Sequence, residues 1–148
     1  MNNMKDEHYL CLENMYLAAP INKIYQPTIE VLESEAKIEI QLSENYFHTA
    51  GAVHGSVYFK MLDDAAFFAA NSMVRDVFVL TTSFTTYITR PVSSGILRAE
   101  GRVLNSNKSQ IIAEAVAYDE NNREVARGNG VFMRSKIKLA GIKEYNVD

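Results

Sequence analysis

Residues 55–73, with the sequence GSVYFKMLDDAAFFAANSM, decide the fold. Ala, Met, Leu and Phe dominate this stretch, and as a helix it is apolar over most of its circumference. A helix of that kind is buried on several sides instead of lying on a surface. We therefore predict one long helix at the centre of the molecule, with the rest of the chain folded around it.

Segments on both sides of this helix alternate apolar and polar residues, which is typical of strands. The alternation is clearest in residues 36–42, where Ile38, Ile40 and Leu42 share one face. Residues 23–32 form a predicted strand before it, with a turn at 33–35. Four more strands are predicted after the helix, at residues 78–89, 97–104, 110–118 and 125–133. Short turns join these four, which predicts an antiparallel meander.

The predicted fold class is α+β, because a sheet that accompanies a single apolar helix must fold round that helix to cover it. We expect an antiparallel sheet of about six strands wrapped around one long central helix. Residues 4–17 predict a short amphipathic helix that stops before Pro20. The 148 residues fit one domain, with a core at about 23–134 and a partly disordered tail at 135–148.

Composition excludes several classes of partner. The net charge is −3 and the isoelectric point about 5.6, so neither nucleic acid nor an anionic membrane is an expected partner. No apolar run approaches the roughly 20 residues of a membrane span. The first 20 residues lack an apolar signal core, and the one cysteine, Cys11, cannot form an internal disulfide. We expect a cytoplasmic protein.

Two adjacent carboxylates lie in the middle of the predicted helix, and the helical wheel separates them. Asp64 falls on a polar edge, where it can pair with Lys60 one turn earlier, and we interpret it as a solvated surface charge. Asp63 falls on an apolar stripe, where an ionised carboxylate is costly unless partnered. Desolvation raises the pKa of such a group, which makes Asp63 a candidate general base or nucleophile. The alternative is a structural Asp bonded to a neighbouring strand or at an oligomer interface.

The start of the helix offers a second candidate group. The first amides of a helix are unpaired and carry partial positive charge, and Gly55 has no side chain to block its N–H. This amide can form half of an oxyanion hole, or the segment can be simply a tight turn before a helix. Gly55 and Asp63 are about 12 Å apart along one helix at 1.5 Å per residue. If both act on one carbon, two antiparallel copies of the helix must meet in a twofold dimer.

Several segments, taken together, resemble the hotdog-fold thioesterases, in particular the PaaI-type (phenylacetic-acid-pathway) branch of acyl-CoA thioesterases. Residues 48–63, HTAGAVHGSVYFKMLD, have the family's histidine and glycine at the helix start, an Asp nine residues after that histidine, and an Asn–Ser pair near the helix end at 71–72. Residues 87–91 (YITRP), Gly95, 99–103 (AEGRV) and 126–132 (ARGNGVF) are also similar. The resemblance covers about residues 25–134.

The resemblance implies hydrolysis of an acyl-CoA to a free acid and coenzyme A. In this scheme the Gly55 amide polarises the thioester carbonyl, and Asp63 of the facing subunit activates water or attacks directly. Thr81 matches a position that helps to hold the water or the carboxylate, and His54 matches the motif histidine, which is structural or close to the carbonyl. The family needs no metal or redox cofactor, coenzyme A being part of the substrate. It forms homodimers, usually paired into tetramers.

Two positions depart from the family pattern. His48 stands where Asn or Gln is common; it can orient substrate or water, or be a loop histidine on the surface. Ser56 replaces the second glycine of the motif, which affects how closely an acyl chain passes. The remaining substrate-binding candidates are Phe59 and Phe67 for the acyl group, and Arg90, Arg102 and Lys108 for the phosphates of coenzyme A. The alternative for the two aromatic residues is a place in the core, and for each cation a solvated surface charge.

Two other functions fit the same fold. One is a non-catalytic acyl-CoA-binding hotdog protein, a sensor or scaffold, although such a protein gains little from a carboxylate on an apolar face. The other is a hotdog dehydratase, which requires a paired histidine and acidic residue that the sequence lacks. The acyl-CoA thioesterase is the function that the sequence favours.

Overall fold

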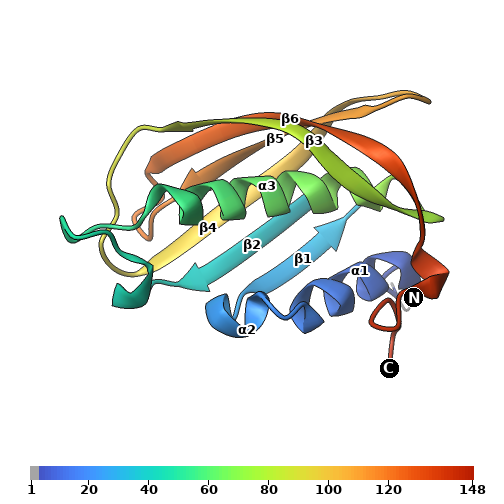
Figure 1. Cartoon of the computed structure of the whole chain (residues 1–148), viewed down its shortest axis with the longest axis horizontal. Helices are drawn as coiled ribbons and strands as arrows, with labels where there is room; N and C mark the ends of the chain where they lie inside the picture. Colours follow the sequence, from blue (N-terminus) through green and yellow to red (C-terminus); the bar gives the residue numbers. More distant parts are fainter. Residues whose placement is uncertain (1–3) are drawn as a thin grey trace.

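A computed structural model describes residues 4–148. Two helices, α1 and α2, precede the first strand, and the long helix α3 lies between β2 and β3 (Figure 1). The elements in chain order are α1 (Glu7–Ala18), α2 (Asn22–Tyr25), β1 (Thr28–Leu32), β2 (Glu35–Gln41), η1 (Glu44–Tyr46), α3 (Gly55–Ser72), β3 (Val77–Ile88), β4 (Ile96–Ser106), β5 (Ile111–Tyr118), β6 (Glu124–Lys138) and η2 (Leu139–Gly141).

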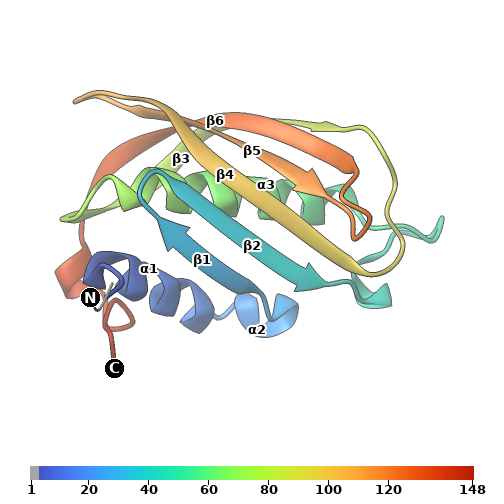
Figure 2. The same ribbon diagram turned by 180° about the vertical axis from the view of Figure 1, so that it is seen from behind.

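The six strands form one antiparallel sheet in the order β1-β2-β4-β5-β6-β3. The sheet curves round α3, and Figure 2 shows its outer face with β2, β4 and β5 in front of the helix. The predicted α+β class, with about six strands around one central helix, is confirmed. The predicted meander of the last four strands is wrong in one respect. β3 pairs with β6 and not with β4, because residues 89–95 carry the chain across the sheet to β2 before β4 begins.

Small residues let α3 lie close against the sheet. Ala65, Ala66, Ala69 and Ala70 are completely buried on the helix. Gly101 of β4 lies so near the helix backbone that a Cβ there would come 2.3 Å from the carbonyl oxygen of Ala65. This close approach buries α3 on several sides, as the apolar circumference of residues 55–73 predicted.

Two segments differ from the sequence-based prediction. Residues 23–25, predicted as the start of a strand, belong to the single helical turn α2, which ends at Gln26 with a left-handed φ of 49°. The tail, predicted to be partly disordered, is packed. β6 continues to Lys138, Leu139 is 1% exposed, and the Tyr145 hydroxyl is 2.6 Å from Nδ1 of His8. Long-range contacts of this kind leave no local signal in the sequence.

The N- and C-terminal segments lie together beside α1 (Figures 1 and 2). α1 packs against β1, where the Val31 amide donates a hydrogen bond of 2.8 Å to the Glu13 carboxylate. α1 therefore covers one edge of the sheet, while β3 forms the other edge. In residues 4–148, no helix combines the length and hydropathy needed to cross a membrane.

Candidate active site

Asp63 lies on the side of α3 that faces β3. Its Oδ1 accepts a hydrogen bond of 2.9 Å from Oγ1 of Thr81 on β3, the residue that the resemblance placed beside the carboxylate. Burial raises the pKa of Asp63 to about 6, against the opposing effect of the Thr81 hydrogen bond. A carboxylate with this pKa is ionised at neutral pH and is still basic enough to take a proton.

Asp64, one residue further along, lies in a different environment. Lys60 Nζ is 2.5 Å from its Oδ2, so the predicted ion pair is present. Asp64 is not the solvated charge that we expected, because its side chain is only 20% exposed and accepts a second hydrogen bond of 2.7 Å from the Tyr16 hydroxyl. The cover comes from α1, whose position over this face of α3 the wheel of a single helix does not reveal.

The head of α3 is built from the motif residues 54–56. His54 caps the helix, since its Nδ1 accepts hydrogen bonds from the Ser56 amide (3.1 Å) and contacts Ser56 Oγ (2.8 Å). Among residues 4–148, no atom accepts a hydrogen bond from the Gly55 amide. The His54 side chain therefore has a structural bond, and the Gly55 N–H at the positive end of the helix is left for another acceptor.

His48 lies in the loop before α3 and not near Asp63. Its side chain is exposed, and its Nδ1 accepts a hydrogen bond of 3.1 Å from the Ala50 amide. The turn ends at Gly51, whose φ of +84° favours glycine. The exposed side chain fits the interpretation of His48 as a surface loop histidine.

A cleft of about 610 Å³ runs along α3, with Asp63 in its wall. β3 forms one side of the cleft and α1–α2 the other, so the N-terminal segment contributes to the candidate site. Most of the lining is apolar and much of it aromatic. The lining residues are Met15, Tyr16, Ala19, Ile21, Asn22, Tyr25, Ser56, Phe59, Lys60, Asp63, Asp64, Phe67, Phe68, Phe78, Leu80 and Thr81.

Three of the predicted substrate-binding residues line this cleft. Phe67 packs against Phe68 and Phe78, with ring centroids 5.0 and 5.1 Å away. Phe59 is 42% exposed and meets Phe84 edge-on at 5.7 Å. Ser56 lines both this cleft and a smaller hollow of about 320 Å³ at the head of α3. Tyr25 also lines both hollows, so the two are neighbours.

The three predicted phosphate-binding cations lie in different places. Arg90 follows β3 near the head of α3, and its carbonyl accepts a hydrogen bond from Tyr58. Arg102 pairs with Glu114 at 2.6 Å on the outer face of the sheet, so the structure does not bring it to the cleft. Lys108 lies in the turn between β4 and β5, at the end of the molecule where α3 ends (Figure 1). Arg90 is therefore the cation best placed for a ligand at the helix start.

Sequence reasoning missed the wall of the cleft that α1 and α2 supply. Tyr16 and Asn22 contact Lys60, which places them on the same side of α3 as Asp64. The one available signal was the apolar spacing in residues 4–17, which predicts a helix without saying what it covers. In the described part of the chain, no cluster of three His, Cys, Asp or Glu side chains is arranged to hold a metal ion.

Comparison with known proteins gives concordant matches. The model of the thioesterase superfamily matches residues 50–126. A curated protein of Saccharolobus solfataricus, named as an esterase, is 22% identical over 98 residues, or 66% of this chain. The match spans 65% of the length of that relative, slightly less than two thirds.

Solved structures match over nearly their full length. The E. coli PaaI protein from the phenylacetic acid degradation operon has a TM-score of 0.80 at 20% identity, covering 90% of this chain and 99% of that one. A thioesterase family protein from Silicibacter pomeroyi has a TM-score of 0.79 at 19% identity, covering 86% and 97%. These likenesses confirm the predicted hotdog fold.

Proposed function

This chain belongs to the thioesterase superfamily, and from that premise we propose that it hydrolyses an acyl-CoA thioester to a free acid and coenzyme A. The observation that carries the proposal is Asp63: a carboxylate in an apolar cleft, held by Thr81, with its pKa raised to about 6 by burial. A structural carboxylate gains nothing from this position, whereas a general base or nucleophile does.

The second group of the proposed site is the Gly55 amide at the head of α3. A thioester carbonyl becomes negatively charged at oxygen when its carbon is attacked, and a free N–H at a helix start stabilises that charge. Gly55 and Asp63 of one chain are too far apart to serve one carbon, at about 12 Å along the helix. We therefore propose that Asp63 acts with Gly55 of the partner subunit in a twofold homodimer.

The free edge of the sheet supports this dimer. β3 is a long edge strand, and among residues 4–148 no strand pairs with its outer edge. Large apolar side chains are exposed along it, with Leu80 at 45%, Tyr87 at 58% and Ile88 at 47%. A long, apolar, open edge is a surface for pairing with a second chain. We propose that β3 pairs with β3 of the partner, and that two such dimers form a tetramer, as the resemblance implies.

The proposed chemistry needs water and the groups of the chain. As the water oxygen bonds to the carbonyl carbon, Asp63 takes the water proton, and the carbonyl oxygen becomes an oxyanion beside the Gly55 amide. Collapse of this intermediate breaks the C–S bond, and the coenzyme A thiolate takes up the proton as it leaves. Direct attack by Asp63 instead gives an acyl–enzyme anhydride that water then cleaves; a single turnover in labelled water distinguishes the two routes.

The test is thiol release from a panel of short, medium, long and aryl acyl-CoAs. Asp63→Asn and Asp63→Ala should lower kcat/KM at least about a hundredfold, the scale of losing a general base. Asp76→Asn, an exposed carboxylate between α3 and β3, is the matched control and should leave the rate unchanged. Tight binding of acyl-CoA with no thiol release from any substrate would favour the non-catalytic binding protein instead.

A further inference from the structure

A polar cluster joins α3 to the N-terminal wall of the cleft. Lys60 Nζ contacts Asp64 Oδ2 at 2.5 Å, Asn22 Oδ1 at 2.8 Å and the Tyr16 hydroxyl at 3.3 Å. The ammonium also lies 5.1 Å from the ring centres of Tyr16 and Tyr25. Residues of α1, α2 and α3 thus meet at one cation inside the cleft.

The donor count shows what Lys60 does there. An ammonium group has three N–H donors, and three acceptors already surround this one, so no donor is free for a ligand. The side chain is only 12% exposed, which keeps water from competing for these bonds. Lys60 is therefore a cross-link between the wall and the central helix, not a group that binds the substrate.

Tyr16 is the largest side chain of the wall that is hydrogen-bonded to Lys60. Its hydroxyl donates to Asp64 at 2.7 Å, and burial raises the pKa of the phenol, so it stays a donor. Its ring meets Phe68 edge-on at 4.9 Å. Fixed at the hydroxyl and along the ring, Tyr16 cannot turn aside for a longer ligand without breaking these contacts.

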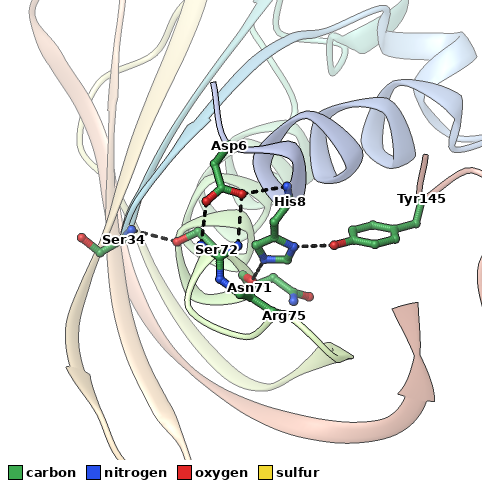
Figure 3. Close-up of polar contacts among 7 residues, drawn as sticks. All are labelled: Asp6, His8, Ser34, Asn71, Ser72, Arg75 and Tyr145. Atoms are coloured by element: carbon green, nitrogen blue, oxygen red, sulfur yellow. Dashed lines mark hydrogen bonds and ion pairs between the residues drawn. The ribbon is translucent and has the colours of Figure 1, made fainter. Parts of the chain in front are cut away.

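The rest of α1 is anchored as well. Glu13 accepts a hydrogen bond of 2.8 Å from the Val31 amide of β1. At the start of the helix, His8 bonds to the carbonyl of Asn71 at 2.9 Å, as Figure 3 shows. With contacts at both ends and in the middle, α1 is a fixed wall opposite β3.

Resting on the proposed function, we propose that Tyr16 limits the length of the acyl group that the cleft accepts, and that Lys60 is the positioning residue that holds it in place. Tyr16 from α1 and Phe78 and Leu80 from β3 line the same cleft as Asp63, so under this proposal an acyl group that enters beside Asp63 runs against the Tyr16 ring. The acyl chain that fits best is the one that ends at this ring.

The experiment measures kcat/KM for straight-chain acyl-CoAs from acetyl to dodecanoyl at about pH 8, where Asp63 is ionised. Tyr16→Ala should move the optimum to longer chains, with a change of at least about tenfold in the ratio of long to short substrates. Ala19→Leu adds bulk to the same wall and should move the optimum to shorter chains. This second variant keeps the test decisive if Tyr16→Ala is poorly folded.

The hydroxyl and the cross-link are tested separately. Lys60→Met keeps the apolar stem and removes all three donors, so we expect a broader optimum and a higher KM with little change in kcat. Tyr16→Phe keeps the ring but removes the hydroxyl that Lys60 and Asp64 hold, so it should broaden the optimum in the same direction as Lys60→Met and less than Tyr16→Ala. The matched controls are Leu17→Ala, exposed on the same helix outside the cleft, and Lys23→Met, exposed on α2.

Two outcomes overturn the proposal in different ways. If wild-type protein releases no thiol from any acyl-CoA, the proposed function itself fails and the inference falls with it. If wild-type protein is active, and Tyr16→Ala or Ala19→Leu retains the wild-type profile of chain length while folded, Tyr16 does not set the length. A changed profile in Leu17→Ala would equally contradict the assignment to Tyr16.

Discussion

The two ends of α3 satisfy their polar groups in opposite ways. At the C-terminal end, Asn71 is completely buried and its side chain makes three hydrogen bonds, to the carbonyls of Val74 and Val77 and from the amide of Val79. At the N-terminal end, no described residue accepts a hydrogen bond from the Gly55 amide.

The surroundings of the two ends also differ, because one end is enclosed by the rest of the chain and the other is exposed. The C-terminal end is enclosed by residues from the rest of the chain, including the hydrogen bonds of Ser72 with Ser34 and of His8 with Tyr145 (Figure 3). The N-terminal end is bordered by exposed apolar side chains, Phe59 at 42% and Ile88 at 47%. A closed polar network stabilises one chain, whereas an open donor among exposed apolar groups is suited to a second molecule.

Both ends of α3 carry residues of the family motif. Substitutions should show that the C-terminal end serves stability and the N-terminal end serves activity. Asn71→Ala removes three hydrogen bonds to buried backbone groups, so we expect the free energy of unfolding to fall by about 3 kcal/mol or more. Urea unfolding at a fixed protein concentration measures this loss. Asn129→Ala, an exposed residue of β6, is the matched control and should cost less than about 0.5 kcal/mol. A stable Asn71→Ala protein with low activity would place function at this end too.

The next largest effect is expected at the opposite end, on activity and not on stability. Gly55→Pro deletes the free N–H at the first helical position, which proline tolerates well. His54 has φ −63° and ψ 143°, the extended conformation that a residue before proline requires. We expect kcat/KM to fall about a hundredfold, the scale of losing an oxyanion donor, while the free energy of unfolding is unchanged or rises slightly.

Gly55→Ala is the control for this variant, because it retains the N–H. A Cβ at residue 55 would come 3.4 Å from Cδ1 of Ile88, an ordinary contact with the end of a flexible side chain. Its activity should lie between those of the wild type and the proline variant. Full activity of a folded Gly55→Pro protein would exclude this amide from the reaction. The N-terminal end of α3 would then have no demonstrated role in activity.

The fold was predictable where the signal is local. The apolar circumference of residues 55–73 was enough to place α3 at the centre, and alternation located the strands. The pairing of β3 with β6 was not predictable, because alternation identifies a strand and not its neighbour. The packed tail was missed for the same reason: Leu139 is buried and Tyr145 partly buried by contacts with residues far away in the sequence.

The candidate site was predictable to the extent that one helix determines it. The wheel separated Asp63 from Asp64 and predicted the pair with Lys60. It could not predict that Asp64 is covered, since the cover is Tyr16, 48 residues earlier. The Thr81 contact to Asp63 came from the resemblance and not from local pattern, because it joins α3 to β3.

Asp63, like Gly55, is assigned here to function, and burial of its ionised carboxylate should lower the free energy of unfolding. Its pKa of about 6 in the folded state lies above the usual 3.8, so the folded state binds more protons between these values and stability falls as pH rises through them. The shift corresponds to at most about 3 kcal/mol, which partial exposure to solvent reduces to about 1–2 kcal/mol. Asp63→Asn should be more stable than wild type at pH 7 by that amount, and equally stable at about pH 3.5. Urea unfolding at both pH values tests this.

The smallest effect is expected at the closed end, with the opposite dependence on pH. His8 Nε2 donates to the Asn71 carbonyl, so Nδ1 is left to accept from the Tyr145 hydroxyl, and the ring is neutral. Desolvation by burial lowers the pKa of His8, so the unfolded chain binds this proton more readily and stability is lost as pH falls below about 6.5. A protonated ring would also turn Nδ1 into a donor and break the bond that holds the tail. His8→Gln should remove this acid sensitivity in urea unfolding, whereas His48→Gln, in the exposed loop, should retain it. An unchanged pH dependence in His8→Gln would show that the closed end of α3 is not closed by this histidine.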